Sequence, residues 1–170
     1  MRKLKTLVIA AVLFLGVNST VSAQTKVAHI NVSELIPLMP EVKAASDQLK
    51  KLGDGFEKDY SSMTADYRTK AEKYGSEAKT AGDALNETRG KELQELEGRI
   101  MKFQQNAQAE LAKKEGELQA PIMEKARLAI HKVAKAKGFD YVLDSSLGSG
   151  VIMAEGTNLL SDVKAELKIK

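Results

Sequence analysis

Apolar residues recur every three or four positions along the middle of the chain, in two series separated by a gap. The first series runs from Ala45 to Leu85 and the second from Leu93 to Val133, and each advances 40 residues in 11 steps. The second series keeps this spacing if the stem of Lys114 fills one apolar position. A period of about 3.6 residues is that of a straight α-helix. The pattern therefore predicts two long helices of equal length that pair with each other.

The gap between the two series, from Thr80 to Glu92, predicts a turn. It contains Gly82 and Gly90, and a turn here would make an antiparallel helical hairpin. We assign residues 41–137 to this hairpin arm, with its tip near residues 80–92. Each helix would be roughly 60 Å long, whereas a compact chain of this size has a radius of gyration of about 15 Å. The arm must therefore project from the rest of the protein.

Glycine interrupts the helical pattern at five positions and weakens both predicted helices. These positions are Gly53, Gly55, Gly75, Gly98 and Gly116. Each glycine costs about 1 kcal/mol relative to alanine. Any one of them is more simply a tolerated surface residue, but together they favour arms that bend and splay.

The segment from Lys26 to Leu35 alternates apolar and polar residues and predicts a strand that leads into a short helix. One face of the strand would carry Ala28, Ile30 and Val32. Ser33 would cap the short helix, and Pro37 and Pro40 would break the chain before the arm begins.

After Gly138 the pattern changes from the helical period to the alternation of a strand. The apolar positions of this strand would be Phe139, Tyr141 and Leu143. A further short strand is predicted over residues 150–155, which include Ile152, and Thr157 or Asn158 would cap a last helix.

These two ends, residues 24–40 and 138–170, predict a β-rich body of about three short strands. So few strands are marginally stable alone and leave open edges. Joining the sheets of several subunits would cover those edges, so we expect an oligomer. The predicted fold class is therefore α+β, with a long antiparallel helical hairpin projecting from a small β body.

The first 23 residues predict a secretory signal peptide. Three basic residues precede an apolar run over residues 7–17, and Val21-Ser22-Ala23 fits a small-x-small cleavage site. The alternative is a membrane anchor, which needs about 20 apolar residues to span the hydrocarbon. We therefore expect export to the periplasm, cleavage after Ala23 and no stable membrane insertion.

Removal of this segment changes the charge of the chain. Three of the 26 basic residues and none of the 23 acidic residues lie in it, so the remainder carries 23 of each sign. A neutral balance gives no reason to expect nucleic acid as a partner. The absence of cysteine excludes disulfides and thiolate metal sites.

Residues that could carry catalysis or bind a metal are sparse. The two histidines, His29 and His131, lie far apart, with no metal-ligand or nucleophile spacing around them. The many carboxylates follow the Glu/Lys spacing of solvated helix faces. We expect no enzyme activity, no metal and no cofactor.

Three stretches of the chain resemble the Skp/OmpH-like periplasmic chaperone family. They are VAHINVSEL near the start, PIMEKARLAIHKVAKAKGFDYVLDSS after the hairpin, and SDVKAELK at the end. The resemblance implies a homotrimer with a β-barrel body and three helical tentacles around a cavity. It also implies an ATP-independent holdase that binds unfolded outer-membrane proteins and prevents their aggregation in transit.

Candidate client-binding residues are apolar arm residues that the helix pairing leaves over. They are Met63, Met101 and Phe103. Methionine suits promiscuous contacts, although packing between the helices explains each residue more simply. The trimer body would use the strand residues Ala28, Ile30, Val32, Phe139, Tyr141, Leu143 and Ile152.

A basic cluster near the end of the second helix could bind an anionic surface. It consists of Lys125, Arg127, Lys132, Lys135 and Lys137. The simpler interpretation is that these residues complement a helix C-terminus. The neutral balance of the chain argues against lipopolysaccharide as a partner.

The rival function is a structural periplasmic coiled-coil spacer, or an adaptor with one defined partner. A spacer would favour a rigid and continuous seam between its helices, whereas the arm glycines favour the holdase. A membrane-surface helix would need a basic polar face, and the charges here are mixed.

Overall fold

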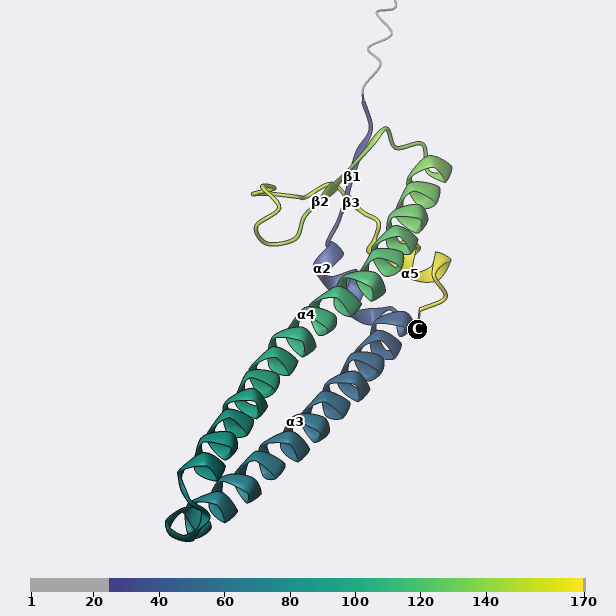
Figure 1. Cartoon of the computed structure of the whole chain (residues 1–170). Helices are drawn as coiled ribbons and strands as arrows, with labels where there is room; N and C mark the ends of the chain where they lie inside the picture. Colours follow the sequence, from purple (N-terminus) through teal and green to yellow (C-terminus); the bar gives the residue numbers. More distant parts are fainter. Residues whose placement is uncertain (1–24, 170) are drawn as a thin grey trace, which may run out of the picture.

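Two long antiparallel helices project from a small body (Figure 1). The computed structural model describes residues 25–169, so the predicted signal peptide and its cleavage site lie outside the described residues. Helix α3 (Pro40–Ala81) has 42 residues, and helix α4 (Asp83–Ala136) has 54. At 1.5 Å per residue α3 is about 60 Å long, so the predicted projecting hairpin is confirmed. No helix within residues 25–169 is long and apolar enough to cross a membrane.

The two apolar series of the sequence form the contact between α3 and α4. In the second series every position from Leu93 to Val133 is buried or half-buried, including Lys114. Phe56 of α3 and Phe103 of α4 meet edge to face, with ring centroids 6.0 Å apart and an interplanar angle of 80°. This geometry is favourable for aromatic pairs and fixes the register of the two helices.

The tip is tighter than predicted, because Gly82 alone separates the two helices. Its φ of +76° lies in the left-handed region, which glycine reaches without a steric penalty. Gly90, the other turn candidate, is helical, and Leu85 belongs to α4 rather than to the first helix. Asn86 Nδ2 donates to the carbonyl of Ala78 at 2.8 Å, which satisfies one acceptor at the end of α3.

The body contains a three-stranded parallel sheet in the order β2-β1-β3. Its strands are β1 (Val27–Ile30), β2 (Tyr141–Asp144) and β3 (Thr157–Asn158). Parallel strands need a long crossover connection, and between β1 and β2 the whole hairpin arm is that connection. Both ends of the arm are therefore anchored at one sheet.

The first predicted strand was too long, because Val32 is helical. Helix α2 (Val32–Leu35) begins after Asn31, whose Oδ1 accepts from the backbone N of Glu34 at 3.1 Å. The Asn31 side chain also donates to Glu34 Oε1 at 2.9 Å. Asn31, and not Ser33, is therefore the N-cap.

The strand predicted over residues 150–155 is absent, and the short β3 forms just after it. The position of β3 is set by pairing with Ala28 and His29 of β1 rather than by local alternation. The cap prediction was wrong in position, because α5 (Leu160–Glu166) has Leu159 as its N-cap. Asn158 Oδ1 nevertheless accepts from the backbone N of Leu160 at 2.8 Å.

The hydrophobic core lies where the sheet, α5 and the end of α4 meet (Figure 1). Its fully buried side chains include Ile30, Leu35, Met39, Leu159 and Val163. Facing them, α4 contributes Ala126, Ala129 and Val133. The last turns of α4 therefore pack in the body, which explains why α4 is longer than α3.

Pro37 and Pro40 lie at helix starts, and the predicted break before the arm falls at Met39, whose backbone is extended with a ψ of 131°. Pro37 is in the short 3-10 helix η1 (Ile36–Leu38), and Pro40 is the first residue of α3. The first helical turn tolerates proline because its N–H would be unpaired there anyway.

Candidate functional site

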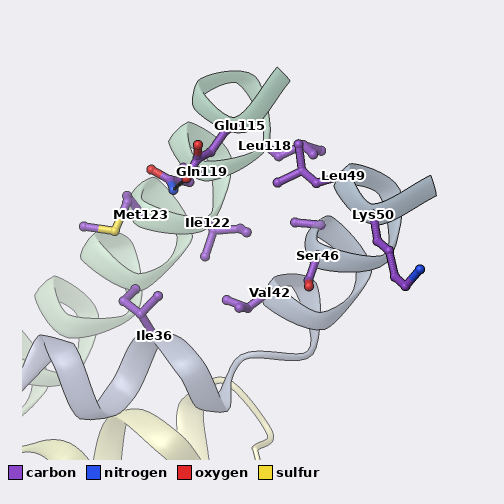
Figure 2. A pocket seen from close by; sticks show the side chains of 11 residues that line it. Ile36, Val42, Ser46, Leu49, Lys50, Glu115, Leu118, Gln119, Ile122 and Met123 are labelled. Atoms are coloured by element: carbon purple, nitrogen blue, oxygen red, sulfur yellow. Dashed lines mark hydrogen bonds between the residues drawn. The ribbon is translucent and has the colours of Figure 1, made fainter. Parts of the chain in front are cut away.

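An apolar hollow of about 550 Å³ lies between the roots of α3 and α4. Figure 2 shows Leu49 and Leu118 close together at one end of it, and Val42 pointing across towards Ile122. Ile36 of η1 rises from the body and closes the other end. The hollow is therefore built from three elements that meet where the arm leaves the body.

Both small and large side chains line the hollow at the root of the arm. Ala45 and Ser46 line it opposite the larger Leu118 and Ile122. A second hollow, of about 300 Å³, shares Ala45, Leu118 and Ile122 and also borders Pro121. At the root, α3 and α4 therefore touch through only a few side chains that separate the two hollows. Farther along the arm they are joined by the aromatic contact between Phe56 and Phe103.

Polar groups surround the first hollow on both helices. Ser46 and Lys50 belong to α3, while Glu115 and Gln119 belong to α4. Gln119 Nε2 donates to Glu115 Oε1 at 3.0 Å, and Lys50 pairs with Asp54 at 2.7 Å. Donors, acceptors and one charge of each sign therefore surround an apolar floor.

The three candidate client-binding residues differ in accessibility. Met63 and Phe103 are half-buried between α3 and α4, and Phe103 packs edge to face against Phe56. Met101 is 54% exposed. Tyr60 and Leu85 are further large apolar residues exposed along the arm.

The predicted body residues fall into two sets. Ala28 and Ile30 are buried in the protomer's own core, and Val32 and Phe139 are half-buried against it. The outward set is exposed: Tyr141, Leu143 and Ile152. Leu147 and Met153 extend this exposed set along the loop between β2 and β3.

Ion pairs occupy most of the predicted basic cluster. Lys125 pairs with Glu41, Arg127 with Glu124, Lys132 with Glu166, and Lys137 with Asp162. Within residues 25–169, Lys135 is the one member of the cluster without an ion-pair partner. The cluster therefore presents much less net positive charge than its sequence indicates.

A polar cluster that the sequence did not predict joins helices α3 and α4 near the tip of the arm. Lys70 and Tyr74 of α3 both donate to Glu92 of α4, at 2.6 Å each. Arg89 of α4 pairs with Glu77 of α3 and lies over the Tyr74 ring, 4.7 Å from its centroid. The bonds from Lys70 and then Tyr74 lower the pKa of Glu92. The signal in the sequence was opposite charges on either side of the predicted turn, with Lys70 and Glu92 22 positions apart and Glu77 and Arg89 12 positions apart.

A second polar cluster closes the body at the end of β2. Ser146, which is 6% exposed, accepts from the backbone N of Ser33 at 3.0 Å and bonds to Asp144. Partial burial raises the pKa of Asp144, but hydrogen bonds from Ser146 Oγ and from the backbone N of Ser146 and Val32 outweigh it, so this pKa is lowered. This cluster links the strand end to α2 and is structural. Within residues 25–169, no group of three His, Asp or Glu side chains is placed to hold a metal ion.

The fold defines a class of proteins in which a long helical hairpin projects from a small body with a three-stranded sheet. The family model of the outer membrane protein (OmpH-like) family matches residues 26–167. The chain belongs to the OmpH-like family, which confirms the resemblance seen in the sequence.

A crystal structure from Caulobacter crescentus CB15 has the same fold. It is of a candidate outer membrane chaperone (OmpH-like), with a TM-score of 0.74 and 18% sequence identity over 85% of each chain. No curated protein sequence matches the chain.

Proposed function

We propose that this chain is an ATP-independent holdase of the periplasm, which binds unfolded outer-membrane proteins and prevents their aggregation. The observation that carries the proposal is an arm about 60 Å long with apolar side chains accessible along it, in a member of the OmpH-like family. Unfolded outer-membrane proteins carry only weak, alternating hydrophobicity. Many weak contacts along several arms would hold such a chain by avidity. In this proposal residues 1–23 direct export and are removed after Ala23.

We propose further that the protein acts as a homotrimer joined through the edges of the sheet. Strands β2 and β3 are both edge strands, and open edges favour pairing with another chain. Tyr141, Leu143 and Ile152 are exposed beside these edges and would be covered in the trimer. Ala28 and Ile30 support the interface indirectly, because they stabilise the protomer's core.

The first experiment is light scattering of the protein alone and after dilution of a urea-unfolded outer-membrane β-barrel protein into it. The holdase proposal expects a trimer that gains one client and keeps the solution clear. A monomer or dimer, or a trimer that leaves the client to aggregate, would instead support the structural spacer or adaptor.

A matched pair of variants tests the interface. Leu143 and Leu85 are both 46% exposed but lie at opposite ends of the molecule. Leu143→Asp places a charge at the proposed interface and should lower the mass measured by light scattering. Leu85→Asp makes the same change near the arm tip and should leave the mass unchanged. Equal masses for the two variants would contradict the interface.

A further inference from the structure

We propose that the hollow between the roots of α3 and α4 is a binding site for one bulky apolar side chain of an extended client polypeptide. This inference rests on the holdase function proposed above and assigns a specific place to one of its contacts. The hollow combines an apolar interior, a polar mouth and a suitable size.

The interior selects an apolar occupant. Its surface is formed by Val42, Leu49, Leu118 and Ile122, with Ile36 at the body end. At about 550 Å³ the hollow lies within the range of sites that bind small organic groups. An aromatic or branched aliphatic side chain fits this volume and removes apolar surface from water on both partners.

The mouth selects a polypeptide rather than a lipid chain or a charged small molecule. Ser46 on one lip and Gln119 on the other can both donate and accept hydrogen bonds, as an extended backbone requires. An acyl chain would gain nothing from these groups. Lys50 and Glu115, the two charged residues at the mouth, already bond to Asp54 and Gln119, so a charged ligand would have to compete with these partners.

Alternation along a strand fits the same geometry. Successive side chains of an extended segment point to opposite sides, so one can enter the hollow while its neighbours stay in water. An unfolded β-barrel protein offers this pattern repeatedly. The hollow would therefore accept many different segments of one client and would add affinity without defining a sequence.

The test is a titration with a twelve-residue peptide in which Phe alternates with Ser and Thr, followed by NMR of the methionine methyl groups. Met123 lines the hollow, Met63 and Met101 report contacts farther along the arm, and Met153, in the loop between β2 and β3, serves as the internal control. We expect the Met123 signal to shift and saturate. A peptide with Ser in place of every Phe should produce no shift, and laurate should not displace the Phe peptide. A shift with the Ser peptide, displacement by laurate, or no shift with the Phe peptide would overturn the inference.

Two variants complete the experiment. Ser46→Phe places a ring in the hollow and should weaken binding of the peptide about tenfold or more, because the entering side chain loses its apolar surroundings. Ser62→Phe makes the same change at an exposed site elsewhere on α3 and should change the affinity less than about twofold. Unchanged affinity in Ser46→Phe would overturn the inference, as would a lower mass of this variant in light scattering, since the latter would show that a second copy fills the hollow.

Failure of this inference is distinguishable from failure of the proposed function. If Ser46→Phe protects an unfolded barrel protein and binds the peptide as well as the unmodified chain does, the hollow is not the site, although the holdase proposal stands. If the peptide binds as expected but the client aggregates, the site stands and the holdase proposal fails.

Discussion

Replacing the five arm glycines with alanine should make the protein markedly more stable. Gly53, Gly55, Gly75, Gly98 and Gly116 all lie within continuous helix, and an added Cβ at any of them meets no atom within 4 Å. None has a positive φ. Each substitution should therefore add about 0.5–1 kcal/mol through helix propensity and a less flexible unfolded chain. Because the new methyl groups do not meet, the sum is about 2.5–5 kcal/mol.

The measurement is urea unfolding followed by far-ultraviolet circular dichroism. Gly82→Ala and Gly138→Ala are the matched controls, because the φ values at these glycines are +76° and +72°. There the same substitution should destabilise the protein by about 1–2 kcal/mol, since a Cβ disfavours the left-handed region. A five-alanine variant that is no more stable than the unmodified chain would refute the argument that these glycines only weaken the helices.

The same five-alanine variant tests whether flexible arms matter for holding clients. If bending and splaying let the arms adapt to their cargo, the stiffer variant should suppress aggregation of large clients less well. Suppression should be measured by light scattering with barrel proteins of increasing size. Equal protection across all sizes would mean that the glycines do not serve client binding.

Three smaller predictions concern individual contacts. Phe103→Ala should lower the free energy of unfolding by about 1–3 kcal/mol. A double-mutant cycle with Phe56→Ala should give a coupling energy of about 0.5–1.5 kcal/mol. A coupling energy of zero would mean that the edge-to-face contact contributes nothing to stability. The pKa of Glu92 is lowered in the folded protein by Lys70, so its stabilisation is present above the unfolded pKa of about 4.3 and is lost as the pH falls through the folded pKa. Urea unfolding should therefore show that the free energy of unfolding falls less on acidification in Glu92→Gln than in the unmodified chain. Equal decreases in the two proteins would contradict this. Ser146→Ala should lower the free energy of unfolding by about 1–3 kcal/mol, because it removes the hydrogen bonds of the buried Ser146 hydroxyl with the backbone N of Ser33 and with Asp144. Thermal unfolding would show the loss, and an unchanged midpoint would contradict it.

Much of the arm could be predicted because its signal is local and repeated. The residues that meet across the seam, such as Phe56 and Phe103, already stood in two series of helical period. The position of the turn was less certain, since Gly82 and Gly90 are both compatible with it. Of these two glycines only Gly82 takes a positive φ, and the ion pairs between α3 and α4 form on either side of it.

The body was harder to predict because its strands depend on distant partners. Thr157 and Asn158 form β3 only because β1 offers a free edge there, while the apolar segment before them has no partner within the protomer. The end of β1 did carry a local signal, since Asn31 followed three residues later by Glu34 is the pattern of a capping box. The hollow at the arm root could not be predicted, because its lining combines side chains of η1, α3 and α4 that are far apart in the sequence.

The central place of β1 in the sheet has a consequence for how the protein is made. Lys26 bonds to Asp140, 114 positions later, and both neighbours of β1 come from beyond that point. A chain that emerges with its N-terminus first therefore holds β1 without partners until nearly all of it has appeared. The hairpin depends mostly on contacts near in sequence and can form during that interval, whereas long-range strand pairing is slow. We therefore expect the arm to form early in folding and the sheet that anchors it to close last, around the first strand to be synthesised.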